Sequence, residues 1–135
     1  MSSPAHDIAE LLTGSDTPSS IVLTMGADLF VNVEPNLPHL IVTVFDTIGD
    51  TREMRQDIFH PSVMIRVKAM PGDYESGYQL IADVMEYLHG LNNVIIDSMR
   101  YIQIVASSDI NAIGRDENNR PIFSANFRIM RTNSI

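Results

Sequence analysis

Residues 113–132 read IGRDENNRPIFSANFRIMRT and decide the class of fold. From position 121 onward apolar and polar side chains alternate, and a period of two is the pattern of a strand with one buried face. The residues GRDENNRP before it are polar and rich in turn formers, which predicts a solvated hairpin tip within a long loop over 110–121. The expected buried face is Phe123, Ala125, Phe127 and Ile129, and the opposite face is Ser124, Asn126, Arg128 and Met130.

Several earlier stretches also have the composition of strands. Residues 62–70 (SVMIRVKAM) alternate cleanly, with Val63, Ile65, Val67 and Ala69 on one face. Residues 39–47 (HLIVTVFDT) are apolar on both faces, which predicts a strand in the middle of a sheet. Short strands are expected over 21–25 (IVLTM) and 29–33 (LFVNV), a longer one over 94–109 with Ile102, Ile104 and Ala106 on one face, and an irregular or edge segment over 51–62 (TREMRQDIFHPS).

Two segments have the period of an amphipathic helix. The first begins at Pro4, with Ser3 as its N-cap, and stops at Gly14. The second follows Asp73, which can cap it, and ends at Gly90. The apolar stripe is Ile8, Leu11 and Leu12 in the first helix, and Tyr74, Tyr78, Ile81, Val84, Met85 and Leu88 in the second.

The order of these elements predicts an α+β fold. A helix, a group of strands, a second helix and a further group of strands favour a mostly antiparallel or mixed β-sheet with the helices packed on one face. The length of 135 residues suits one domain, and we expect that domain to span residues 1–135.

Composition limits the classes of function. The chain has 9 Lys and Arg against 17 Asp and Glu, for a net charge of −8, so its field disfavours tight binding to nucleic acid or to anionic membranes. It has no cysteine, which excludes a disulfide framework and a Cys-based zinc site. No stretch approaches the roughly 18 apolar residues of a membrane span and no signal peptide is visible, so we expect a soluble protein.

The sequence offers little for catalysis. His6 and Glu10 are four apart, with Asp7 beside them, and a metal-dependent hydrolase could use such a pair with a distant carboxylate. Acidic residues near a helix start are favoured by the helix dipole in any case, so a solvated helix face is the preferred interpretation. Glycine-rich phosphate loops and calcium-loop patterns are also missing from the sequence. We therefore expect no enzymatic activity, no cofactor and no metal.

The same closing segment carries arginines suited to an interface between subunits. Arg forms bidentate pairs with carboxylates, and exposed Met and Arg are enriched at protein interfaces. A basic hairpin could therefore dock head to tail on an acidic flank of another copy. The predicted interface residues are Arg115, Asp116, Arg120, Arg128, Met130 and Arg131, together with Arg66 and Met64.

A resemblance to a known family supports assembly. The run MRYIQIVASSDINAIGRDENNRPIFSANFRIMR, residues 99–131, resembles the carboxyl-terminal part of the tail terminator proteins of tailed bacteriophages, also called tail completion or minor capsid proteins. The leading helix, the meander of strands with its proline-rich turn EPNLP and the central helix after a strand are similar as well.

This resemblance implies a structural virion protein. It implies a homo-hexameric ring at the head-proximal end of the tail tube, which ends tube polymerisation and joins tail to head. The partners would be further copies, the tail tube protein and head-completion or connector proteins, with DNA passing through without specific binding. The protein would lie in the tail or neck of the virion after assembly in the host cytoplasm. A head–tail connector or stopper of the neck is the alternative.

Overall fold

A computed structural model describes residues 2–36, 40–52 and 57–133 of the protein. Most of these residues form helices and strands, and the two longest elements are α2 and β8. The elements in chain order are α1 (Pro4–Thr13), β1 (Leu29–Val31), β2 (Ile41–Thr47), β3 (Ile58–Phe59), β4 (Ser62–Lys68), α2 (Tyr74–Leu88), β5 (Asn92–Ile96), β6 (Met99–Ala106), β7 (Asn111–Arg115) and β8 (Pro121–Thr132).

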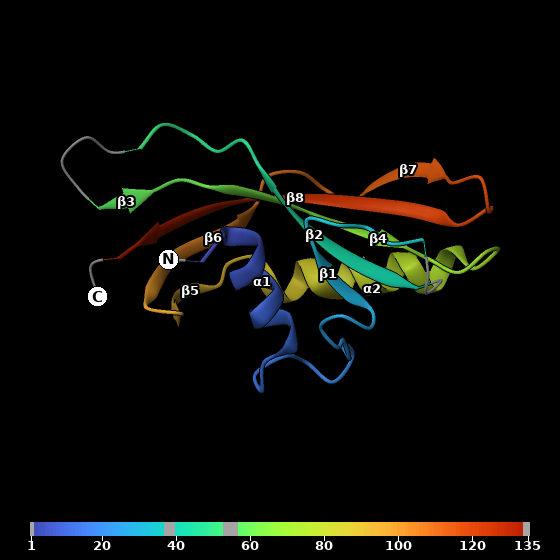
Figure 1. Cartoon of the computed structure of the whole chain (residues 1–135), viewed down its shortest axis with the longest axis horizontal. Helices are drawn as coiled ribbons and strands as arrows, with labels where there is room; N and C mark the ends of the chain where they lie inside the picture. Colours follow the sequence, from blue (N-terminus) through green and yellow to red (C-terminus); the bar gives the residue numbers. More distant parts are fainter. Residues whose placement is uncertain (1, 37–39, 53–56, 134–135) are drawn as a thin grey trace.

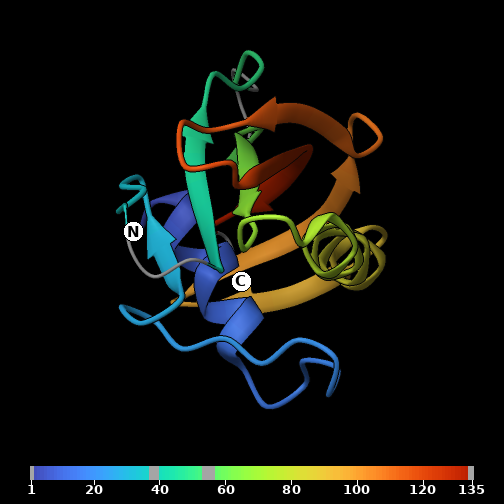
Figure 2. The same cartoon turned by 90° about the vertical axis from the view of Figure 1, so that its right-hand side faces the viewer.

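The strands form one mixed, mostly antiparallel sheet. Its order is β1-β2-β4-β8-β6-β5, with β3 and β7 also paired to β8. Only the pairing of β1 with β2 is parallel among the described strands. Both helices lie on the same side of the curved sheet (Figures 1 and 2). The α+β fold expected from the order of the elements is therefore confirmed.

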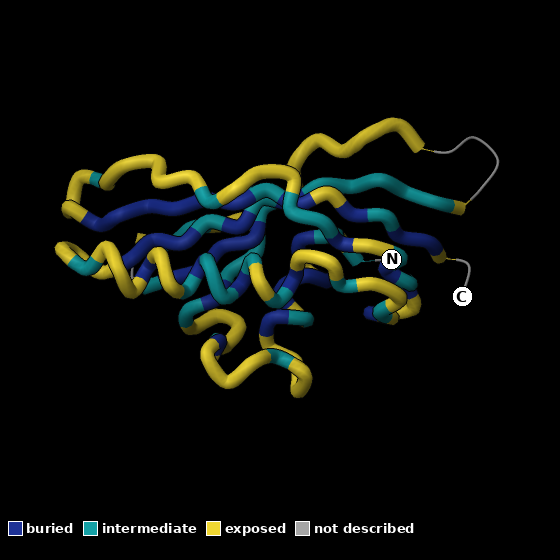
Figure 3. Tube along the Cα trace, turned by 180° about the vertical axis from the view of Figure 1, so that it is seen from behind, coloured by how far each residue is buried: buried dark blue, intermediate teal, exposed yellow. Residues whose placement is uncertain are grey.

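Strand β8 is the central strand of this sheet, because two strands pair with each of its edges. On one edge it pairs with β4 over residues 122–128 and with β3 over residues 131–132. On the other edge it pairs with β7 over residues 121–124 and with β6 over residues 127–132. Figure 3 shows β8 buried along most of its length, while β7 beside it is exposed throughout.

The core lies between this sheet and the two helices. The alternating residues of β8 and β4 are buried as predicted, and Ile8 and Leu12 of α1 and Ile81, Val84 and Leu88 of α2 pack against them. Helix α2 approaches the sheet closely because Gly77 has no side chain. A Cβ atom there would meet the Cβ atom of Ala69 at 2.6 Å and the ring of Phe123 at 2.8 Å. Tyr74 and Tyr78, predicted on the core stripe, lie at its margin with 41% of each residue exposed.

Two of the expected strands and one expected loop differ from the structure. Residues 21–25 form no strand, and their one bridge joins Met25 to Leu29. Residues 94–109 are not one strand but most of the β5–β6 hairpin, whose turn is Asp97 and Ser98, both with positive φ. The predicted loop 110–121 contains β7, which pairs with the start of β8.

A bulge overturns the predicted alternation of β6. The register shifts between Tyr101 and Gln103, so Tyr101 and Ile104 share the buried face and Ile102 leaves it.

In the region predicted to be irregular or at an edge, the short strand β3 pairs with the end of β8. Two predictions fall partly outside the described residues. The expected strand 39–47 begins within positions 37–39, and part of the expected irregular segment 51–62 falls at positions 53–56. Neither described helix is long and apolar enough to cross a membrane.

Candidate assembly surface

The tip between β7 and β8 is organised by Asp116. One oxygen of its carboxylate accepts hydrogen bonds from the backbone N–H groups of Asn118 (3.0 Å) and Arg120 (2.9 Å), and the other pairs with Nε of Arg120 at 2.8 Å. Desolvation alone would raise the pKa of Asp116, but these hydrogen bonds and the Arg120 charge outweigh it and lower the pKa. Arg115, at the end of β7, is exposed and donates to Oδ1 of Asn119 at 3.1 Å. The predicted hairpin tip is therefore an ordered turn with an exposed arginine beside it.

Arg120 is buried and connects this tip to a distant loop. Its Nη2 donates to Oδ1 of Asn36 at 2.7 Å, and its Nη1 donates to the backbone oxygen of Asn36. The two preceding residues are held in the same way, because Lys68 Nζ donates to the backbone oxygen of Pro35 at 2.8 Å and Arg66 pairs with Glu34 at 3.1 Å. Two cations of β4 (Arg66 and Lys68) and Arg120, which precedes β8, thus fasten residues 34–36, and we call this arrangement the cation clasp. Burial lowers the pKa of Lys68, with the Arg120 charge acting in the same direction.

Arg131 is also buried, on the face that carries the helices. Its Nη1 lies 3.3 Å from Oδ2 of Asp7 in α1, and it donates to the hydroxyl of Tyr101 and to the backbone oxygen of Ser2, each at 3.1 Å. The Tyr101 hydroxyl in turn donates to Oδ2 of Asp7. Burial raises the pKa of Asp7 despite the hydrogen bond from Tyr101 and the charge of Arg131, and burial also raises the pKa of Tyr101. This cluster joins both ends of the chain to the sheet.

The face of the sheet away from the helices carries the other predicted interface residues. Arg128 is exposed there, and no carboxylate among the described residues pairs with it. A cleft of about 560 Å³ surrounds it. Its walls are Ile48, Gly49, Asp50, His60, Pro61 and Ser62 on one side and Gln103, Val105, Ser107 and Ser108 on the other, with Asn126, Arg128, Ile129 and Met130 on β8. Met64 and Met130 are half-buried on this face.

The structure therefore divides the predicted interface residues into two groups. Arg115 and Arg128 are exposed, and Met64, Met130, Arg66 and Asp116 are partly exposed. Arg120 and Arg131 are buried with internal partners, so they stabilise the subunit in this structure. Arg131 follows Met130 on an alternating strand and so returns to the core face, where its partner Asp7 lies 124 positions away in the sequence. The interface itself remains a prediction.

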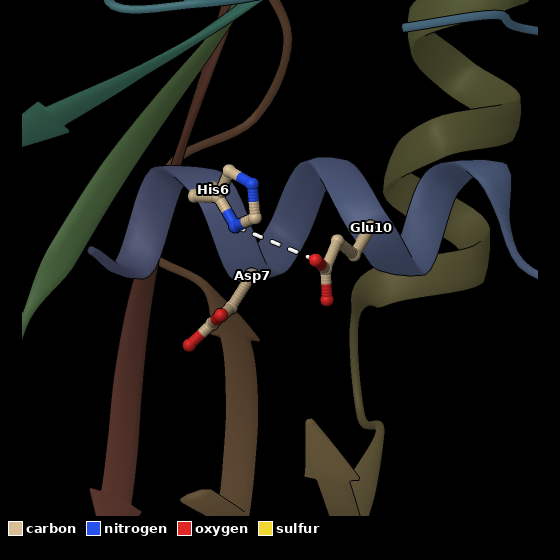
Figure 4. Close-up of side chains that lie close together, drawn as sticks. All are labelled: His6, Asp7 and Glu10. Atoms are coloured by element: carbon tan, nitrogen blue, oxygen red, sulfur yellow. Dashed lines mark ion pairs between the residues drawn. The ribbon is translucent and has the colours of Figure 1, made fainter. Parts of the chain in front are cut away.

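The cluster of His6, Asp7 and Glu10 was the metal candidate. His6 and Glu10 form a half-exposed pair, with Nδ1 and Oε1 3.6 Å apart, whereas Asp7 points away toward the sheet (Figure 4). One ligand atom from each residue falls within 4.8 Å of the others. One oxygen of Asp7 already accepts hydrogen bonds from Tyr101 and Arg131, so its role in the structure is to join α1 to the sheet. The spacing of His6 and Glu10 is explained by their pairing on the exposed side of α1, four residues apart.

Comparisons with known proteins agree with this geometry. A family model described as bacteriophage tail terminator protein matches residues 19–133. A chain from the virion of a native gene transfer agent particle has a similar fold, with a TM-score of 0.72 and 13% sequence identity over 96% of this chain and 94% of that chain. No curated protein matches the sequence. The resemblance inferred from residues 99–131 is confirmed, and the chain belongs to the bacteriophage tail terminator family, a structural, non-enzymatic family of virion proteins.

Proposed function

We propose that this phage tail protein forms a homo-hexameric ring at the head-proximal end of the tail tube, ends tube polymerisation and joins the tail to the head. The observation that carries the proposal is the open face of the sheet. Both helices cover the other face, while this one holds a cleft of about 560 Å³ and the exposed Arg128, which no described carboxylate neutralises. Arg and Met are enriched at protein interfaces, and both Arg128 and Met130 line this cleft.

The proposed partners are further copies, the tail tube protein and the head-completion or connector proteins. DNA would pass through the ring without specific binding. The net charge of −8 suits such a passage, because a wall that neutralised phosphates would hold the DNA in place.

Two measurements test this function. Size-exclusion chromatography with light scattering, with and without the tail tube protein of the same genome, should show a hexamer-sized species in at least one of the two samples. Electron microscopy of particles assembled without this protein should show tails of uncontrolled length. Tails of normal length on heads that leak DNA would instead indicate a stopper of the neck.

A further inference from the structure

The β7–β8 hairpin presents one apolar and one cationic side chain outside the core. The register between β7 and β8 shifts between Ala112 and Gly114, so Ile113 is left without a partner in β8. A bulge of this kind re-aims a side chain, and Ile113 is 50% exposed. Arg115 follows two residues later and is also exposed. The acid beside it, Asp116, is already paired with Arg120, so Arg115 retains its positive charge at this surface.

A groove of about 350 Å³ has the complementary character. It lies between the segment 20–28 and α2. Its apolar lining includes Val22, which is 78% exposed, and the half-buried Leu23, Leu40 and Leu80. Its two acidic side chains are Asp28 and Asp83.

The charges of α2 extend this complementarity. Glu75, Asp83 and Glu86 lie on the solvent side of α2 at helical spacing, and α2 has no Lys or Arg. A cation that arrives at the groove therefore meets Asp83, with Glu75 and Glu86 on the solvent side of the same helix and no Lys or Arg on that helix.

The hairpin of one molecule is placed away from its own groove. It extends on one side of α2, and the segment 20–28 lies on the other side (Figures 1 and 2). Contact between the hairpin and such a groove is therefore a contact between two molecules. Since hairpin and groove are different surfaces, the contact is heterologous and can propagate from copy to copy until it closes.

We propose that the β7–β8 hairpin of one copy docks in the groove between residues 20–28 and α2 of the next copy. Ile113 enters the apolar lining formed by Val22, Leu40 and Leu80, and Arg115 pairs with Asp28 and Asp83. Glu117, at the turn of the hairpin, remains in solvent at the rim. This proposal rests on the self-assembly proposed above and adds a contact between copies that is separate from the open face with Arg128.

Engineered cysteines test the contact directly, because the natural chain has none. Val22→Cys and Ile113→Cys are made in separate chains, which are mixed under assembly conditions and oxidised mildly. A disulfide-linked dimer should form in the mixture and should be rare in either variant alone. Ile95→Cys mixed with Val22→Cys is the matched control, because Ile95 is 59% exposed and lies outside both the hairpin and the cleft around Arg128. Equal cross-linking in the control, or none in the mixture while rings form, overturns the proposed contact and leaves the ring.

A charge exchange provides the second test. Arg115→Glu alone and Asp83→Arg alone should each weaken association by roughly tenfold or more, as for an interface hot spot. The two changes in one chain should recover part of the lost association, since they re-form the 115–83 pair with its signs reversed while Asp28 keeps its negative charge. Arg52→Glu makes the same change in net charge at an exposed site outside the hairpin and should leave association near that of the natural protein. Failure of the double variant to recover, with all variants folded, overturns the pairing. A chain that remains monomeric even with tail tube protein overturns the ring and this contact together.

Discussion

The guanidinium of Arg131 lies 3.3 Å from the buried carboxylate of Asp7, so the last strand of the sheet is fastened to the first helix. Less than a tenth of either side chain is exposed. The ends of the chain are therefore joined by an ion pair and by the Tyr101 hydroxyl that bonds to both members. Such a pair costs desolvation when it forms, but removing one member leaves an uncompensated charge inside the protein.

Replacement of Arg131 by Met should destabilise the protein strongly. The carboxylate of Asp7 would remain buried without its cation, a loss on the order of 3–5 kcal/mol in the free energy of unfolding. Urea denaturation followed by circular dichroism measures it. Arg128→Met removes an exposed arginine from the same strand and should change the free energy by less than about 0.5 kcal/mol. Equal effects of the two substitutions would contradict the assigned role of Arg131.

The raised pKa of Asp7 gives a pH dependence with a definite sign. Above its ordinary pKa of 3.8 the unfolded chain releases the Asp7 proton, whereas the folded protein still retains it. The folded state then binds more protons, so the stability contributed by this group falls as the pH rises from 3.8 through the raised folded pKa.

Asp7→Asn should remove this dependence. Denaturation of both proteins at a series of pH values from about 3.5 to 7 gives the difference in stability, natural protein minus variant. That difference should decline with rising pH and then level off. The opposing contribution of Asp116, whose pKa is lowered, is common to both proteins and cancels. A difference that rises with pH would show that the carboxylate is stabilised in its charged form instead.

Substitution in the cation clasp should release residues 34–36. Arg120→Met leaves Asp116 without its ion-pair partner and removes both hydrogen bonds to Asn36. We expect a loss of about 2–4 kcal/mol, because hydrogen bonds to charged groups contribute about 1.5–3 kcal/mol each and are not additive.

Hydrogen exchange locates the effect of that substitution. Amide protection should fall at Glu34, at Asn36 and at the β7–β8 turn, and should persist in α1. The control is Arg115→Met, which removes an exposed arginine from the same hairpin and a single hydrogen bond to Asn119. Unchanged protection at Glu34 and Asn36 in Arg120→Met would show that Lys68 and Arg66 hold the loop without it.

Gly77→Ala tests the close approach of α2 to the sheet. Alanine favours a helix over glycine by roughly 1 kcal/mol, whereas overpacking costs about 1–3 kcal/mol. The new Cβ atom would lie 2.6 Å from Ala69 Cβ, so we expect the steric cost to win and the midpoint of thermal unfolding to fall. Gly14→Ala, where the nearest atoms are 3.5 Å away, is the control. A higher midpoint in Gly77→Ala would show that helix and sheet separate easily.

Elements with a strict period could be predicted from the sequence. Strands β4 and β8 alternate throughout, and α1 and α2 have both caps and apolar stripes, so local chemistry alone indicates them. Strand β7 could not be predicted in the same way, since all of its residues are exposed and its pairing with β8 determines its conformation. The β5–β6 turn lacks glycine, although Asp97 and Ser98 both adopt positive φ.

The candidate surface was predicted only in part, because periodicity shows which face of a strand a residue occupies but not which distant residues it contacts. Alternation correctly placed Arg128 and Met130 on the face away from the core. It could not reveal that Arg120 is bound by Asn36 or Arg131 by Asp7, because these partners come from distant parts of the chain. Pairing of buried charges depends on three-dimensional proximity, which no period in the sequence records.

The shared edges of β8 have a mechanical consequence. A force along this strand acts on the hydrogen bonds to β4 and β3 on one edge and to β7 and β6 on the other at the same time. These hydrogen bonds are therefore loaded together in shear and are not broken one after another. The hairpin at one end of β8 and the Arg131–Asp7 pair near the other are thereby connected through one continuous strand. Tension applied at the tip would therefore be carried along β8 to the Arg131–Asp7 pair and so to α1.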